Sequence, residues 1–175
     1  MLPRVVRLLG EVVAPVVVVA ASGQDVPSLP PNIDIVRDPE QDRGPLQGLA
    51  AGLAALRGRA DAAYLSSCDV PFLQPAFVRR LIALLGEYVI CVPEVGGYRH
   101  PLAAVYRVEA AAATSARLLT ENRLRPAFLF EEVPTRIVGP EELIDADPMF
   151  QTLRNLNTPA EYEAALRDSF AGEDR

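Results

Sequence analysis

The 175-residue chain contains no lysine, so all 17 of its basic residues are arginine. Its residues therefore cannot supply a catalytic or phosphate-binding lysine. Histidine occurs once, at His100, and no serine or cysteine has a neighbouring base that would indicate a nucleophilic triad. The sequence leaves open only a triad that the fold assembles from distant positions.

Cysteine is also scarce, with one residue at Cys68 and one at Cys91, both inside predicted strands. Two such residues argue against a disulfide framework or a zinc site and indicate reduced, buried thiols. The apolar run at 12–21 is far shorter than the roughly 20 residues that span a bilayer. Glu11 and Pro15 also interrupt the segment that would form a signal peptide. We therefore predict a cytoplasmic protein without a membrane partner.

Positive charge is in deficit, because the formal net charge is −6 at pH 7. This balance argues against a nucleic acid or an acidic membrane surface as partner. Half of the residues are hydrophobic and 23% are charged, which is typical of a folded chain. The sequence shows no repeat, low-complexity tract or long linker, so we predict a single domain over residues 1–175.

Segments typical of strands and of helices alternate along the chain. Apolar runs predict strands at 16–21, 33–36, 63–67, 89–93 and 135–138, and an antiparallel strand at 100–106 after a short connection. Amphipathic spacing and capping predict helices at 3–13, 45–56, 75–85, 110–121, 125–130, 140–144 and 159–170. This alternation predicts an α/β fold with a mostly parallel sheet between two layers of helices.

One stretch lies where open parallel sheets bind ligands. The predicted strand at 63–67 leads into Asp69, and Pro71 marks a turn before the helix that begins at Pro75. Ligands lie beyond the carboxyl ends of such strands, and a carboxylate suits a magnesium ion that carries nucleotide phosphates. An aspartate here also closes turns or caps helices, and its position alone favours that simpler role.

A second group of residues follows the predicted strand at 33–36. Asp38 comes soon after this strand, and the segment Gly44-Pro45-Leu46-Gln47-Gly48 begins the next helix. Glycine lets the backbone approach a ligand closely, and a helix N-terminus offers N–H groups that have no partner in the helix. An ordinary loop followed by a helix start explains the same pattern equally well.

Three further polar side chains suit ligand binding. His100 is followed by Pro101, and a lone histidine is more often structural or at the surface than catalytic. Asn155 and Asn157 alternate, so they share one face if the segment is extended. Each asparagine either offers an amide to a ligand or closes a turn, whereas Thr158 is explained by helix capping.

Together these segments resemble the molybdenum cofactor guanylyltransferase family and its nucleotidyltransferase relatives. The resemblance extends from Val16 to about Leu166 and implies a Rossmann-like fold. Its segments occur in the family's order and spacing: Arg37-Asp38, Gly44-Pro45-Leu46 with Gly48, Cys68-Asp69-Val70-Pro71-Phe72-Leu73, His100-Pro101-Leu102 and Asn155-Leu156-Asn157-Thr158-Pro159.

The resemblance implies a Mg²⁺-dependent transfer of GMP from GTP to the terminal phosphate of molybdopterin, with release of pyrophosphate. It makes Asp69 the catalytic metal ligand. The residues implied to bind the nucleotide are Asp38, Gly44, Pro45, Leu46, Gly48 and Asp69. Those implied to bind the pterin substrate are His100, Asn155 and Asn157. The implied partners are GTP, molybdopterin, and molybdoenzymes or their chaperones.

The chain departs from the family at its start. The family opens with a strand and a glycine-rich loop that carries an arginine and a lysine, whereas residues 1–13 correspond to the helix that follows. The resemblance therefore implies that the first strand is missing from the sheet, which exposes strand edges and apolar surface. Three explanations compete for the missing segment. A misassigned start codon and a fragment of a longer protein are favoured over a diverged protein that no longer catalyses.

Without that loop, nothing offsets roughly four negative charges on the triphosphate. We therefore expect weak or no transfer by residues 1–175, and rescue by upstream residues that restore the loop. Related functions stay open: the same chemistry with CTP, transfer to a sugar phosphate, and a non-catalytic adaptor that binds the cofactor.

Overall fold

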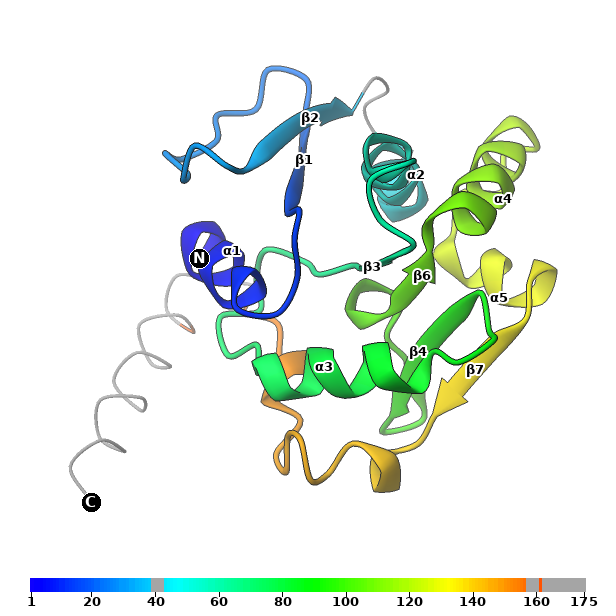
Figure 1. The fold of residues 1–175 in the computed structure, drawn as a ribbon. Helices are drawn as coiled ribbons and strands as arrows, with labels where there is room; N and C mark the ends of the chain where they lie inside the picture. The colour runs from blue at the N-terminus through cyan, green and yellow to red at the C-terminus, as the bar shows by residue number, and fades with distance from the viewer. Residues whose placement is uncertain (39–42, 157–160, 162–175) are drawn as a thin grey trace.

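Helices and strands alternate along the chain in the α/β arrangement that the sequence predicts (Figure 1). The computed structural model describes residues 1–38, 43–156 and 161. The α-helices and strands, in chain order, are α1 (Leu2–Gly10), β1 (Val17–Ala21), β2 (Asp34–Asp38), α2 (Gly44–Leu56), β3 (Ala62–Tyr64), α3 (Pro75–Leu84), β4 (Ile90–Val95), β5 (Tyr98–Arg99), β6 (Val105–Arg107), α4 (Val108–Thr120), α5 (Leu129–Glu132) and β7 (Thr135–Val138). Short 3-10 helices lie at Pro101–Ala103, Pro126–Phe128, Pro140–Glu142 and Gln151–Leu153.

The strands form two hydrogen-bonded groups. β1 and β2 form a parallel pair, with Val17 opposite Asp34 and Ala21 opposite Asp38. The larger sheet has the order β3–β6–β4–β5, and β7 also pairs with β4. β3 and β4 both run antiparallel to β6, and β7 runs parallel to β4, so β3, β4 and β7 point in one direction. Their shared direction brings the carboxyl ends of β3 and β4 to the same edge of the sheet.

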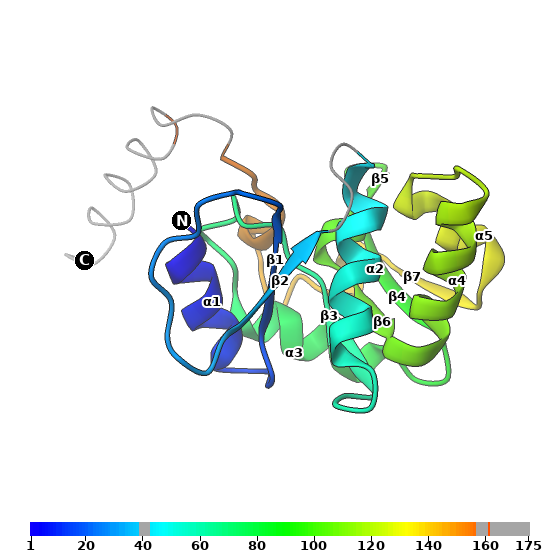
Figure 2. The ribbon, with the colours of Figure 1, turned by 90° about the horizontal axis from the view of Figure 1, so that it is seen from above.

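Helices cover both faces of the larger sheet (Figure 2). The core between this sheet, α2 and α4 includes Leu46, Leu53, Ile90, Tyr106 and Leu118. The core on the opposite face joins the sheet to α3 through residues that include Phe77, Leu81, Cys91, Val105 and Val138. Because side chains alternate along a strand, the neighbours Ile90 and Cys91 belong to different cores. The three-layer arrangement is therefore confirmed.

Helix α1 packs beside α3 and the loop that follows β3. The apolar residues Val5, Val6 and Leu9 lie on one helix face because helical neighbours recur every three to four positions, and all three are buried. Val5 and Leu9 share a core cluster with Val70 and with Val78 of α3. Burial of such a side chain contributes about 1.5–3 kcal/mol. α1 is thereby held against the loop that carries Asp69.

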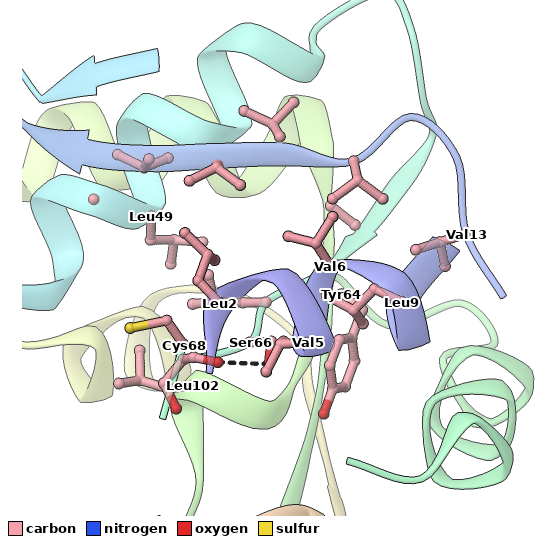
Figure 3. Close-up of a pocket in the computed structure, with 18 of the residues that line it drawn as sticks. Leu2, Val5, Val6, Leu9, Val13, Leu49, Tyr64, Ser66, Cys68 and Leu102 are labelled. Atoms are coloured by element: carbon pink, nitrogen blue, oxygen red, sulfur yellow. Dashed lines mark hydrogen bonds between the residues drawn. The ribbon is translucent and has the colours of Figure 1, made fainter. Parts of the chain in front are cut away.

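A pocket of about 450 Å³ lies between β1 and β3. In the described part of the chain, β1 pairs with β2 alone and β3 with β6 alone, so each has an edge without a strand partner. Figure 3 shows Val5 and Val6 of α1 and Leu49 of α2 among the side chains around this pocket. The family resemblance predicts a further strand inside the sheet, and this apolar gap is where such a strand would pair.

Three local predictions are wrong. The strand expected at 100–106 is interrupted by the 3-10 helix Pro101–Ala103, so that only β6 is extended and antiparallel to β4. The strand expected at 63–67 ends at Tyr64, although Leu65 N–H still donates to Ala104 O at 2.8 Å. Cys68 lies in the turn beyond β3 and is exposed, so the prediction that it is a buried thiol is wrong.

Cys91 is buried as predicted, and both cysteines are free thiols. Burial raises the pKa of the Cys91 thiol to about 11, with a smaller opposing contribution from Arg136. Two predicted helices, 125–130 and 140–144, are mainly short 3-10 segments, each beginning at a proline. The helix predicted at 159–170 lies outside the described residues, apart from Glu161.

Candidate functional site

Asp69 lies in a turn beyond the carboxyl end of β3. The chain between them stays beside the sheet, because Ser67 N–H donates to Leu102 O at 3.3 Å. Asp69 is not the N-cap of α3, since that position is occupied by Gln74 and carries no side-chain cap bond. Of the two simpler roles that the sequence allows, the turn is correct and the helix cap is wrong.

The two carboxylate oxygens of Asp69 have different surroundings. Oδ2 accepts a hydrogen bond of 3.2 Å from Nδ2 of Asn155. Oδ1 is buried and has no hydrogen-bond partner among the described residues. A buried acceptor without a partner is costly, by about 1–3 kcal/mol and more if it is charged. Such an atom in a folded protein indicates a place for a ligand, a water or an ion.

The second predicted group comes from β2 and the start of α2. Asp38 is the last residue of β2, because the strand runs two residues further than the predicted 33–36. Gly44 has φ +72, a left-handed conformation that glycine adopts without strain, and it begins α2. Pro45 follows at a helical position where its missing N–H removes no bond. Gly48 is open, because an added Cβ would meet nothing within 4 Å.

Leu46 differs from its neighbours in this group. Its side chain is fully buried in the core shared by α2 and α4. We therefore correct the prediction that Leu46 binds nucleotide: its side chain packs in the core. Helical periodicity explains the difference, because Leu46, Leu49 and Leu53 share the face of α2 that meets the core.

The fold brings two of the predicted groups to one pocket. Asp38, Gly44, Pro45 and Gly48 line the gap between β1 and β3, and the segment 66–68 lines it from the other side. Asp69 itself does not line this pocket but follows directly after Cys68, which does. The lining is largely apolar, with side chains of α1, β1 and α2 facing one another (Figure 3).

His100 has local partners. Its Nε2 lies 3.4 Å from Val95 O, and its backbone N–H donates to Pro93 O at 3.0 Å. The hydroxyl of the buried Tyr106 donates to Pro101 O at 2.7 Å and holds the next residue. His100 does not line the pocket with Asp38, although the nearby Leu102 does. These contacts fit the structural role that the sequence also allows.

Asn155 lies beside Asp69 rather than apart from it, as its hydrogen bond shows. Leu156 N–H donates to Asp69 O at 2.9 Å, so the backbones of the two segments are also joined. Asn157 lies outside the described residues. The predicted pairing of the two asparagines on one face therefore stays a prediction.

Four residues around this loop were missed by the sequence reasoning: Arg4, Asp147, Thr152 and Arg154. Arg4 Nε donates to Pro71 O at 2.7 Å from α1. Asp147 is only 2% exposed and accepts hydrogen bonds from the N–H groups of Gln151 and Thr152 at 2.9 and 2.8 Å. Asp147 and its two donors are close in sequence, so their spacing is a local signal. The other partners of these four residues are distant in sequence, so no local pattern marks them.

Burial also affects the tyrosines near this loop. The pKa of the Tyr64 hydroxyl is raised, mainly by burial and further by the negative charge of Asp147. The pKa of the Tyr106 hydroxyl is raised by burial. Both side chains therefore remain neutral donors at physiological pH and bring no negative charge to the site.

The described residues contain no group of three or more His, Cys, Asp or Glu side chains arranged to hold a metal ion. A site with one carboxylate nevertheless fits Mg²⁺, which usually keeps several waters and binds one or two carboxylates together with substrate phosphates. The unpartnered Oδ1 of Asp69 has the chemistry of such a ligand. No described helix is both long and apolar enough to cross a membrane.

Known proteins resemble this chain in sequence and in fold. A molybdenum cofactor guanylyltransferase of Desulfosudis oleivorans is 30% identical over 124 residues, which span 70% of this chain and 60% of that protein. A Mycobacterium ulcerans protein named "Probable molybdenum cofactor guanylyltransferase" is 31% identical over 170 residues, or 95% of this chain and 79% of that protein. The chain thus spans less than two thirds of the first relative's length.

A solved structure supports the fold. Molybdopterin-guanine dinucleotide biosynthesis protein A from Archaeoglobus fulgidus superposes with a TM-score of 0.63 at 22% identity, covering 75% of this chain and 66% of that chain. Residues 1–133 match the family described as the MobA-like NTP transferase domain. The match covers more than half of the chain and includes both β3 and Asp69. The chain belongs to the family of MobA-like NTP transferase domains.

Proposed function

We propose that this protein transfers GMP from GTP to the terminal phosphate of molybdopterin. The observation that carries the proposal is Oδ1 of Asp69, which lies beyond the end of β3, is buried, and finds no hydrogen-bond partner among residues 1–38, 43–156 and 161. It lies in the loop next to the pocket that Asp38 and Gly44 line. The two guanylyltransferase relatives support the choice of substrates.

The reaction needs no nucleophile from the protein. A phosphate oxygen of molybdopterin forms a bond to the α-phosphorus of GTP, the bond from that phosphorus to the bridging oxygen breaks, and pyrophosphate leaves with the electron pair. The attacking oxygen is already anionic, so the protein's task is to position groups and to offset charge. This chemistry is consistent with a chain whose lone histidine has local partners, Val95 and Pro93, among the described residues.

Four of the predicted residues have a specific part in this proposal. Asp69 is the residue that would hold Mg²⁺, through Oδ1, and the chemistry such an ion would supply is positive charge at the phosphates. Gly44 and Gly48 leave room for the nucleotide to approach the backbone at the start of α2, whose N-terminus favours anions. Asp38 lies at the edge of the same pocket, where its carboxylate can accept hydrogen bonds from the base or the ribose.

A transfer assay tests the proposal. Protein, MgGTP and molybdopterin are incubated, and the guanine dinucleotide product and pyrophosphate are measured by chromatography. We expect slow turnover, because the chain has no lysine to neutralise a triphosphate, and a loss of at least tenfold in Asp69→Asn. Asp145→Asn, which changes an exposed carboxylate, is the matched control. Equal product from wild type and Asp69→Asn would contradict the proposal.

The base preference needs its own measurement. Titration of the protein with GTP and CTP in the presence of Mg²⁺ compares the two affinities directly. We expect tighter binding of GTP, as the names of the relatives suggest. Tighter binding of CTP, or transfer to a sugar phosphate, would assign the chain to a related nucleotidyltransferase.

One observation favours a non-catalytic alternative. The pocket between β1 and β3 is largely apolar, whereas a triphosphate requires polar and positively charged surroundings. An adaptor that binds the pterin cofactor without transferring a nucleotide would be consistent with this lining. Molybdopterin binding by wild type and Asp69→Asn with equal affinity, and no product from either, would support the adaptor.

A further inference from the structure

The segment 147–156 contacts the Asp69 loop at several points, although the two are far apart in sequence. Leu156 N–H bonds to Asp69 O at 2.9 Å, and the Leu156 side chain is only 2% exposed. Gln74 N–H, at the start of α3, donates to Thr152 Oγ1 at 3.0 Å. The guanidinium of Arg154 lies 5.5 Å from the ring centre of Phe72. The second half of the loop between β3 and α3, from Asp69 to Gln74, is therefore held by this segment.

The segment is itself fixed by a buried carboxylate. Asp147 accepts hydrogen bonds from two successive backbone N–H groups, those of Gln151 and Thr152. These bonds shape the 3-10 helix Gln151–Leu153, and hydrogen bonds to a charged acceptor are about twice as strong as neutral ones. The turn that precedes Asn155 is thus rigid. Asn155 reaches Asp69 from a prepared position rather than from a free chain.

Asn155 bonds only one of the two carboxylate oxygens. Its Nδ2–H donates to Oδ2, while Oδ1 is buried and has no partner in the part of the chain that the structure describes. A neutral amide suits this arrangement, because it donates a hydrogen bond without adding charge that would compete with a cation. A carboxylate fixed through one oxygen presents the other in a single orientation.

From these contacts we propose that Asn155 is a positioning residue for Asp69: it fixes Oδ2 so that Oδ1 points at a divalent cation. This role rests on the proposed function of Asp69 and replaces the prediction that Asn155 contacts the pterin. Residues that orient a metal ligand typically contribute about 10–100-fold to metal affinity. Thr152 and Leu156 act indirectly, because they hold the segment on which Asn155 lies.

Mn²⁺ binding to the full chain tests the role of Asn155 without requiring turnover. Free Mn²⁺ is measured by electron paramagnetic resonance, with and without GTP, for wild type, Asp69→Asn, Asn155→Ala and Asn155→Gln. We expect Asp69→Asn to abolish binding and Asn155→Ala to weaken it by about 10–100-fold. Asn155→Gln keeps the amide donor on a longer side chain, so its affinity should lie between those of Asn155→Ala and wild type.

Two controls separate positioning from folding. Asn32→Ala removes an exposed asparagine before β2 and should leave Mn²⁺ affinity unchanged. The urea midpoint of Asn155→Ala should stay close to that of wild type, because the exposed side-chain bond is lost but the Leu156 backbone bond remains. A large drop in the midpoint together with equal losses in Asn155→Ala and Asn155→Gln would indicate a purely structural residue and overturn the proposal.

The two proposals fail in different ways. If Asp69→Asn loses Mn²⁺ but Asn155→Ala binds it as tightly as wild type, the site stands and the role of Asn155 is rejected. If Asp69→Asn binds Mn²⁺ normally, or if wild type binds none with or without GTP, the metal site itself is rejected together with its positioning residue.

Discussion

The two sides of the candidate site are supported very differently. Asp69 lies in a loop that α1, α3 and the segment 147–156 hold from several directions. Asp38 ends a two-stranded sheet, where it lies opposite Ala21. Much of β2 is exposed, and Ile35 keeps 45% of its surface accessible. The Asp69 side is therefore built by long-range tertiary contacts, and the Asp38 side by one strand pair against α2.

This difference has a consequence for how the protein responds to ligands. Elements with few buried contacts open more readily than the core strands to which they are attached. β1 has an edge without a strand partner in the described chain, and it lines the largely apolar pocket. A ligand that binds there would stabilise the Asp38 side most, whereas Asp69 is already held before a ligand arrives.

The largest expected effect comes from removing the anchor of the Asp69 side. Asp147→Ala leaves two backbone N–H groups without their charged acceptor in a buried position. We expect a loss of about 3 kcal/mol in the free energy of unfolding, measured with urea. Asp145→Ala, at an exposed aspartate two residues away, is the control and should change stability by less than about 0.5 kcal/mol. Similar values for both variants would show that the segment is not held by Asp147.

Hydrogen exchange compares the two sides directly. Backbone amides of β4, such as those of Ile90 and Cys91, lie in fully buried positions of the larger sheet. Amides of the β1–β2 pair should exchange at least about tenfold faster, because their sheet opens locally at lower free energy. Native-state exchange followed by mass spectrometry or NMR measures this ratio. Equal protection of β2 and β4 would remove the distinction between the two sides.

Gly48→Ala separates stability from binding on the Asp38 side. Gly48 lies inside α2, and an added Cβ meets no atom within 4 Å. Alanine should therefore raise stability by about 0.5–1 kcal/mol through its helix propensity and the lower entropy of the unfolded chain. If the nucleotide approaches the backbone here, the same variant should bind GTP more weakly in a titration. A variant that is more stable and binds GTP normally would place the nucleotide elsewhere.

The smallest effect is expected far from both sides, in the surface ion-pair cluster around Glu132. Hydrogen bonds from Arg123 and then from Arg117 hold the pKa of Glu132 below its ordinary value of 4.5. The stability from these bonds is present above that value and is lost as pH falls through the lower folded-state pKa. The urea midpoints of wild type and Glu132→Gln should differ slightly at pH 7 and converge in acid or in high salt. A difference that grows in acid would contradict this assignment.

Elements with a periodic apolar pattern could be predicted closely from the sequence. The strand predicted at 135–138 coincides with β7, and the helix predicted at 75–85 differs from α3 by one residue. The strand predicted at 100–106 failed because Pro101 begins a 3-10 helix, and the Pro101 carbonyl accepts a hydrogen bond from the Tyr106 hydroxyl. Alternation of apolar residues does not report such a contact.

The candidate site was predictable in part. Asp38, Gly44 and Gly48 do share a pocket with the residues that precede Asp69. The position of Asn155 was not predictable, because its partner lies 86 residues away in the sequence. The burial of Leu46 follows from helix periodicity. It was predicted to bind nucleotide instead, because it lies in a segment that resembles the family.

The order of its apolar runs, prolines and glycines was enough to determine that this chain is an α/β protein with candidate site residues at the end of β2 and after β3. Local backbone preferences and hydrophobic periodicity depend on neighbouring residues, so they can be predicted from the sequence alone. Only the tertiary structure decided that Asn155 and Leu156 meet Asp69, and that one carboxylate oxygen of Asp69 has no hydrogen-bond partner among the described residues. Those contacts join segments that the folded core brings together, and no local pattern encodes their distance.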